Sequence, residues 1–153
     1  MEFGSVDEII SFATDREKEA VAFYTDLAKQ ATMVSLKEAF EKFALEEEKH
    51  VELLADMSAN KEKIDSYEFK KIPDLKISDY MVEIDYKEGM PMPQILKLAM
   101  KREERAVQLY TIMADKTDNA DVKKVFNILI QEESKHKFIL ESLYDDYLAE
   151  QEG

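Results

Sequence analysis

The stretch from residue 36 to 57 has the pattern of a helix whose apolar seam is broken by two ionisable side chains. Apolar residues recur in alternating steps of four and three, at Leu36, Phe40, Phe43, Leu54 and Met57. The same rhythm predicts that Glu47 and His50 also face the interior. Removing an ionised carboxylate from water is costly unless a cation or a hydrogen-bond network compensates. A bound metal is one explanation for this placement.

The amino-acid composition favours long helices. Of 153 residues, 36% are charged and 45% are hydrophobic, and there are only three Gly and three Pro. This balance suits amphipathic helices rather than a turn-rich β fold. A chain of this length is about the size of one ordinary domain and can bury a core. We therefore expect a single all-α domain over residues 1–153.

The charge and the missing cysteines exclude several functions. The formal net charge is -13, and no cluster of Lys or Arg offsets it, so neither nucleic acid nor an anionic membrane is expected as a partner. The absence of Cys excludes disulfides, thiol catalysis, iron–sulfur clusters and Cys-ligated zinc or iron in this chain. No apolar run approaches the roughly 20 residues of a membrane span, and the N-terminus lacks a basic-then-apolar signal sequence. A soluble cytoplasmic protein is expected.

Two S-x-x-E sequences have the form of helix capping boxes, Ser5 with Glu8 and Ser35 with Glu38. Apolar or small residues in heptad rhythm follow each of them. The pattern predicts two antiparallel helices joined by a short turn, which we call hairpin 1, at about 5–60. Its helices are expected at about 6–31 and 35–60.

A second hairpin, hairpin 2, is expected at about 92–149. Pro93 suits the first turn of its first helix. A turn is predicted near Thr117–Asn119, and the second helix is predicted to run to about Leu148. Between the hairpins, at 61–91, the helical rhythm lapses, and Tyr80–Tyr86 alternates in a way that fits either a short strand or an extended crossing. A segment of this length can cross the whole bundle.

The two hairpins are an internal repeat. A shift of 86 residues, from Glu17 to Glu103, aligns them without a gap. The polar interruptions of the seams recur at matching places, and the only two histidines, His50 and His136, form a matched pair. The matched residues include Arg16/Arg102, Glu17/Glu103, Ala20/Ala106, Val21/Val107, Tyr24/Tyr110, Ala28/Ala114, Phe40/Phe126, Glu47/Glu133, Lys49/Lys135 and His50/His136.

Distances along the chain predict that these polar residues meet. In each hairpin the two Glu lie at nearly equal distances from the turn, and in antiparallel helices equal distances mean equal height. Packing the hairpins about a pseudo-twofold axis then gathers six residues at one level: Glu17, Glu47, His50, Glu103, Glu133 and His136. Four carboxylates in a dry site would force one another's protonation, whereas two divalent cations would balance their charge. Oxygen-rich sites with one imidazole per metal suit iron or manganese, although affinity alone does not exclude zinc or copper.

The two E-x-x-H motifs in a gap-free repeat resemble the rubrerythrin branch of the ferritin-like superfamily, over nearly the whole chain outside 61–91. The resemblance implies an antiparallel four-helix bundle with a long crossover between its second and third helices. It also implies a carboxylate-bridged centre of two iron ions per chain, with manganese or zinc as alternatives. Carried over by motif, Glu47 and Glu133 would bridge, Glu17 and Glu103 would be terminal ligands, and His50 and His136 would each bind one iron.

The chain departs from rubrerythrins proper in two ways. They carry a rubredoxin-like iron site held by four cysteines, and this chain has no Cys, so electrons would have to come from an external donor protein. They often carry an extra carboxylate one turn beyond the ligand of the third helix, where this chain has Ala106 and Val107. The second departure argues against peroxidase chemistry in which a carboxylate exchanges with His.

Four further residues have two interpretations each. Glu46 and Glu132 precede a His by four residues but lie off the seam, which favours solvated or supporting groups over ligands. Tyr24 and Tyr110 lie two turns beyond Glu17 and Glu103 on the same face. Each phenol could support a ligand carboxylate by a hydrogen bond or supply an electron during oxidation, or it could simply pack in the core with its hydroxyl satisfied.

Three functions are consistent with these sequence features. The first is a di-iron oxidoreductase of oxidative-stress type that reduces hydrogen peroxide or O2. The second is a ferroxidase, or an iron-binding or storage protein without multiple turnover. The third is a metal-free helical interaction module. A homodimer would suit a helical bundle of this kind, although no stripe outside the seam identifies an interface.

Overall fold

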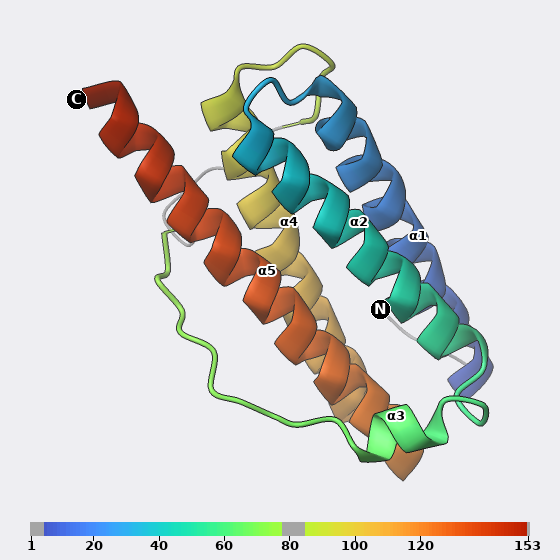
Figure 1. Ribbon diagram of the computed structural model, residues 1–153. Coiled ribbons are helices and arrows are strands. Elements are labelled where there is room, and N and C mark those ends of the chain that lie inside the picture. Colours follow the sequence, from blue (N-terminus) through green and yellow to red (C-terminus); the bar gives the residue numbers. More distant parts are fainter. Residues whose placement is uncertain (1–4, 78–84, 153) are drawn as a thin grey trace.

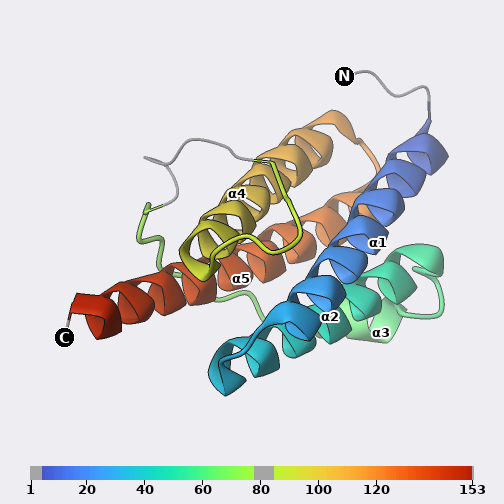
Figure 2. The same ribbon diagram turned by 90° about the horizontal axis from the view of Figure 1, so that it is seen from above.

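The computed structural model describes residues 5–77 and 85–152, with the side chains of residues 151 and 152 left out. These residues form five helices and no strand, as the all-α prediction requires. α1 (Val6–Gln30) and α2 (Val34–Ala55) form one hairpin, and α4 (Met92–Lys116) and α5 (Ala120–Glu152) form the other. Figures 1 and 2 show the two hairpins packed into a four-helix bundle. No helix among the described residues is long and apolar enough to cross a membrane.

The helix starts confirm one of the two capping predictions. The Ser5 hydroxyl accepts a hydrogen bond from the Glu8 backbone N–H at 3.2 Å, so Ser5 caps α1. Ser35 does not cap α2, because that helix begins one residue earlier and has Met33 at its N-cap, with no side-chain cap. Met33 is partly buried and packs against the core, so apolar packing rather than a hydroxyl fixes this helix start. The exposed Ser35 lies inside the first turn.

The second helix ends earlier than the sequence indicates. α2 stops at Ala55 instead of near residue 60. The Asp56 carboxylate accepts from the Ala59 N–H at 3.0 Å, and the Asn60 side chain donates to the Asp56 carbonyl at 2.7 Å. Such side chain–backbone bonds compete with helix continuation. The chain then forms a short helix, α3 (Lys61–Asp65), which is too short to show a periodicity in the sequence.

The crossover that follows α3 runs beside α5 (Figure 1). The Lys70 backbone N–H donates to the Gln131 side chain at 2.6 Å, and Lys137 contacts Asp74 at 2.6 Å. The segment therefore crosses the bundle as predicted. Most of the predicted strand or extended crossing at Tyr80–Tyr86 lies outside the described residues, and 85–87 have neither helix nor strand.

The start of hairpin 2 matches the prediction. Pro93 lies in the first turn of α4, where its missing N–H costs nothing. The turn at 117–119 leads into α5, whose first N–H groups, from Asp121 and Val122, both donate to the Asn119 side chain at 3.1 Å. α5 is somewhat longer than expected and ends at Glu152.

The core consists of two apolar clusters with a polar layer between them. One cluster includes Leu27, Phe40 and Leu96, and the other includes Tyr110 and Phe126. Along α1, α2 and α4, the buried polar residues lie between the stretches that belong to the two clusters. On α5 the same holds for all of them except Glu141, which lies between Leu140 and Tyr144 of the first cluster. The fold thus places ionisable groups in the middle of its length.

Candidate metal centre

The structure brings together the six residues that break the seams. α1 contributes Glu17 and α4 contributes Glu103; α2 contributes Glu47 and His50, and α5 contributes Glu133 and His136. None of the six is more than 5% exposed. Because helical positions three residues apart lie on one face, each E-x-x-H motif projects its carboxylate and imidazole into the bundle together. Sequence periodicity thus predicts both their burial and their convergence.

The six side chains form two overlapping groups of four. Glu17, Glu47, His50 and Glu133 offer ligand atoms that all lie within 4.8 Å of one another. Within the same limit, Glu47, Glu103, Glu133 and His136 form the other group. Only Glu47 and Glu133 belong to both. This geometry suits two neighbouring cations, with Glu47 and Glu133 between them, as the family resemblance implies.

Both imidazole rings turn Nδ1 toward the carboxylates. Nδ1 of His50 lies 3.3 Å from a Glu133 oxygen and 3.4 Å from a Glu17 oxygen. Nδ1 of His136 lies 3.0 Å from Glu47. On the far side of this ring, Nε2 lies 2.7 Å from Glu46 and donates to its carboxylate. A histidine whose outer nitrogen is held by a carboxylate presents the other nitrogen as a lone-pair donor, the usual arrangement of a metal ligand.

Each hairpin also supplies a phenol to the other hairpin's carboxylate. The Tyr110 hydroxyl donates to Glu17 at 2.8 Å, and the Tyr24 hydroxyl makes a short hydrogen bond to Glu103. Both phenols are 1% exposed. The structure thus favours the supporting interpretation of Tyr24 and Tyr110 over simple packing.

The protein by itself leaves this cluster unsatisfied. Among the described residues, five buried atoms make no hydrogen bond: both oxygens of Glu47, one oxygen each of Glu103 and Glu133, and Nδ1 of His136. Nδ1 of His136 and a Glu47 oxygen are only 3.0 Å apart, but they do not form a hydrogen bond. Burial, together with the neighbouring Glu47, raises the pKa of Glu17 to about 8. Burial and the charges of Glu103 and Glu47 raise the pKa of Glu133 well above its usual value. Two bound cations would give the unbonded oxygens a partner and would favour the ionised form of the carboxyls. The donor set therefore fits a di-iron site.

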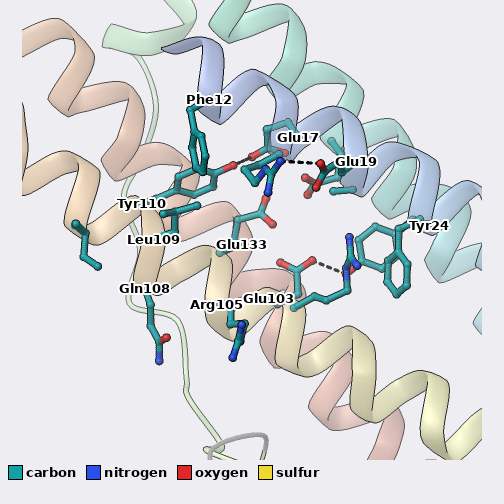
Figure 3. A pocket seen from close by; sticks show the side chains of 17 residues that line it. Phe12, Glu17, Glu19, Tyr24, Glu103, Arg105, Gln108, Leu109, Tyr110 and Glu133 are labelled. Atoms are coloured by element: carbon teal, nitrogen blue, oxygen red, sulfur yellow. Dashed lines mark hydrogen bonds and ion pairs between the residues drawn. The ribbon is translucent and has the colours of Figure 1, made fainter. Parts of the chain in front are cut away.

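A cleft of about 550 Å³ between α1 and α4 reaches the cluster. Figure 3 shows Glu17, Glu103 and Glu133 converging at its floor from three helices. The repeat-related Ala20 and Ala106 line it. The sequence pattern does not predict this opening. One sequence feature is related to it, because the small Ala106 lies in the turn where rubrerythrins often carry an extra carboxylate. The size of a cleft, however, depends on every side chain around it.

The off-seam Glu46 and Glu132 lie behind the histidines, as the interpretation of them as supporting groups predicts. Glu46 holds His136, and a Glu132 oxygen lies 3.8 Å from Nε2 of His50. The sequence does not predict the partners of Glu132. Tyr67 donates to Glu132 at 2.7 Å and Lys135 contacts it at 2.8 Å. Tyr67 lies in the crossover, where the sequence carries no periodicity that would place it.

The fold and the cluster define a ferritin-like four-helix protein with a buried carboxylate–histidine site suited to two metal ions. The family model of rubrerythrin matches residues 8–88 and 94–152, so the chain belongs to the rubrerythrin family, whose members typically bind iron. The chain also resembles the solved structure of a hypothetical protein from Pyrococcus furiosus, with 26% sequence identity and a TM-score of 0.68 over 95% of this chain and 92% of that one. No curated protein matches the sequence.

Proposed function

We propose that the protein is a di-iron oxidoreductase that reduces hydrogen peroxide with electrons from an external donor protein. The observation that carries the proposal is the pair of four-residue groups that share Glu47 and Glu133. An iron pair bound there would supply redox equivalents and Lewis acidity at one O–O bond. The chain has no Cys for a second iron site of the rubredoxin type, so the electrons must arrive from outside.

The protein residues have distinct roles in this proposal. Glu47 and Glu133 would bridge, and Glu17 and Glu103 would each complete one half of the site. The Tyr110 and Tyr24 hydrogen bonds orient the outer carboxylates. The cleft between α1 and α4 admits the oxidant to the floor where these carboxylates lie.

The test compares the two oxidants on the iron-loaded, reduced protein. Stopped-flow mixing is expected to show faster oxidation by hydrogen peroxide than by O2. With a reduced electron-transfer protein present, peroxide should be consumed over many turnovers. Faster oxidation by O2, or a single turnover with peroxide, would overturn the proposal.

One observation favours a second candidate, a ferroxidase or iron-binding protein. Ala106 occupies the turn where rubrerythrins often carry an extra carboxylate, so the six-residue set is close to that of ferroxidase centres. This function would show rapid O2-dependent oxidation of added Fe(II) and release of Fe(III). Elemental analysis after reconstitution with Fe(II) excludes both candidates if it finds no metal, and would then support the metal-free interaction module.

A further inference from the structure

The cleft between α1 and α4 is much larger than hydrogen peroxide needs. Its volume is about 550 Å³, whereas one water molecule occupies about 30 Å³ of liquid. Pockets for organic ligands range over about 300 to 1,000 Å³. The opening therefore has the capacity of a small-molecule site that ends at the candidate metal centre.

Part of the cleft wall is apolar. Phe12 and Phe23 on α1, and Leu109 and Ile112 on α4, line it. Near the carboxylates, the wall is formed in part by Ala20 and Ala106, whose small side chains leave room above the floor. An organic chain would find apolar contacts along these walls, and peroxide alone would not use them.

The cleft also carries a group of arginines, although the protein is strongly acidic overall. Arg16, Arg102 and Arg105 line it together with one acidic residue outside the carboxylate floor, Glu19. Arg16 pairs with Glu19 at 2.7 Å. Arg105 has a contact of its own, so the charge of the rim rests on Arg16 and Arg102. Two guanidinium groups against the one carboxylate of Glu19 leave this rim positive in a chain of net charge -13.

Two of these arginines are held beside the apolar walls. The Arg16 guanidinium lies 5.0 Å from the centre of the Phe12 ring, and that of Arg102 lies 4.1 Å from the centre of the Phe23 ring. Stacking on an aromatic face fixes a guanidinium while leaving its N–H groups in the ring plane able to donate. An apolar wall with a positive rim is complementary to an organic carboxylate.

The geometry points to an organic hydroperoxide that carries a carboxylate as the ligand of this cleft. Its carboxylate lies at Arg16 and Arg102, its carbon chain lies against Phe12, Phe23 and Leu109, and its hydroperoxide group reaches the floor. This assignment rests on the proposed function for its chemical step. In that step the O–O bond of ROOH breaks, two electrons from a reduced electron-transfer protein and two protons are taken up, and the products are ROH and water.

Binding is tested separately from turnover, with an unreactive probe. Calorimetric titration of the zinc-loaded protein with 8-hydroxyoctanoate, which resembles an alcohol product, should show one site per chain. Octane-1,8-diol, which lacks the carboxylate, should bind about tenfold more weakly. Absence of 8-hydroxyoctanoate binding at millimolar concentration, or equal binding of both probes, would overturn the inference.

Variants locate the site. The double variant Arg16→Gln/Arg102→Gln should weaken 8-hydroxyoctanoate binding at least tenfold and leave diol binding unchanged. The matched control Lys37→Gln/Lys123→Gln removes two exposed charges outside the cleft and should change neither. Ala106→Leu should fill the cleft and abolish binding of both probes, while thermal unfolding and zinc content confirm an intact bundle. Loss of binding in the lysine control but not in the arginine variant would place the site elsewhere.

Turnover separates this inference from the proposed function. The ratio of kcat/KM for 8-hydroperoxyoctanoate to that for hydrogen peroxide should fall at least tenfold in Arg16→Gln/Arg102→Gln. If hydrogen peroxide is reduced and the probe does not bind, only the present inference fails. If the probe binds and neither peroxide is reduced, the proposed function fails, and the reductive step of this inference fails with it.

Discussion

The two halves of the candidate metal centre offer the same types of residue, three Glu and one His, but have different surroundings. On the α5 side, Nε2 of His136 lies 2.7 Å from Glu46, within hydrogen-bond distance. On the α2 side, Nε2 of His50 lies 3.8 Å from Glu132, too far for a hydrogen bond. The repeat therefore gives both halves the same types of residue, but the carboxylate behind His136 is hydrogen-bonded to it and the carboxylate behind His50 is not.

Part of the difference lies in the crossover, which supplies Tyr67, and part on α5, which supplies Lys135. Glu132 is bound by Tyr67 and Lys135. Burial alone would raise its pKa, but His50, Lys135 and Tyr67 together lower it to about 2. Apart from His136, Glu46 has an ion pair only with Lys42, at 3.9 Å, among the described residues. Tyr67, which lies outside the internal repeat, thus adds a difference between the two halves.

The largest expected effect comes from removing what the two halves share. Glu47→Ala should reduce the metal content from about two ions per chain to fewer than one, because Glu47 belongs to both groups of four. Glu17→Ala should leave about one ion, because Glu17 belongs to one group. Elemental analysis after reconstitution measures both. Glu48→Ala, an exposed neighbour, is the control, and equal losses in Glu47→Ala and Glu17→Ala would contradict the shared role.

The second effect is a pH dependence of the metal-free protein. Folding raises the pKa of Glu17 from 4.5 to about 8, chiefly through burial. Between these pH values the unfolded chain releases a proton that the folded chain keeps, so the free energy of unfolding falls as pH rises, by up to about 5 kcal/mol for this group. Burial by itself would lower the pKa of His50 and His136, but the surrounding carboxylates raise both pKa values well above the usual value. Both histidines therefore also make the free energy of unfolding fall as pH rises.

Urea unfolding from pH 5 to pH 8 measures this dependence. Glu17→Gln should flatten it and Glu19→Gln, which alters an exposed carboxylate, should not. Zinc should release protons on binding and remove most of the slope. A metal-free protein whose stability rises over this range would show that the cluster is solvated.

Third in size is the difference between the two supporting carboxylates. Glu46→Gln should weaken metal binding on the His136 side by about 10- to 100-fold, because a direct carboxylate–imidazole hydrogen bond is lost. Glu132→Gln should have a smaller effect, since its carboxylate lies 3.8 Å from His50. A two-step metal titration measures both constants. A larger effect of Glu132→Gln would reverse the comparison.

The smallest expected effect tests the role of the crossover. Tyr67→Phe removes a hydroxyl that donates to Glu132 and accepts from Gln131, and should cost about 1 kcal/mol of stability and change one metal-binding step severalfold. Tyr86→Phe is the matched control, because Tyr86 is a crossover tyrosine that binds Asp26 far from the metal ligands. It should cost similar stability and leave metal binding unchanged. If the two variants affect the metal alike, the crossover does not tune the site.

The sequence predicts the inner part of this molecule better than its outer part. Glu17, Glu47 and His50 are predictable because a regular helix converts spacing into direction, and the repeat supplies a second copy as a check. The start of α2 is not predictable in this way, since Ser35 has the form of a cap but Met33 is the N-cap residue. The short α3 is not predictable either, because its five residues are too few to show a helical period. Tyr67 and Glu132 are hydrogen-bonded although 65 residues separate them in the sequence. Such a contact of an irregular segment cannot be predicted, because no local sequence pattern marks it.

The polar layer between the two apolar clusters implies how the chain opens. Each end of the bundle has its own aliphatic and aromatic contacts, whereas the middle is held chiefly by ionisable groups and whatever neutralises them. Without that neutralisation the weakest cross-section lies at mid-height, and backbone amides near Glu47 and Glu133 should exchange with solvent before those at either end. When cations are bound, the two ends of the bundle, which otherwise open separately by local unfolding, would unfold as one cooperative unit.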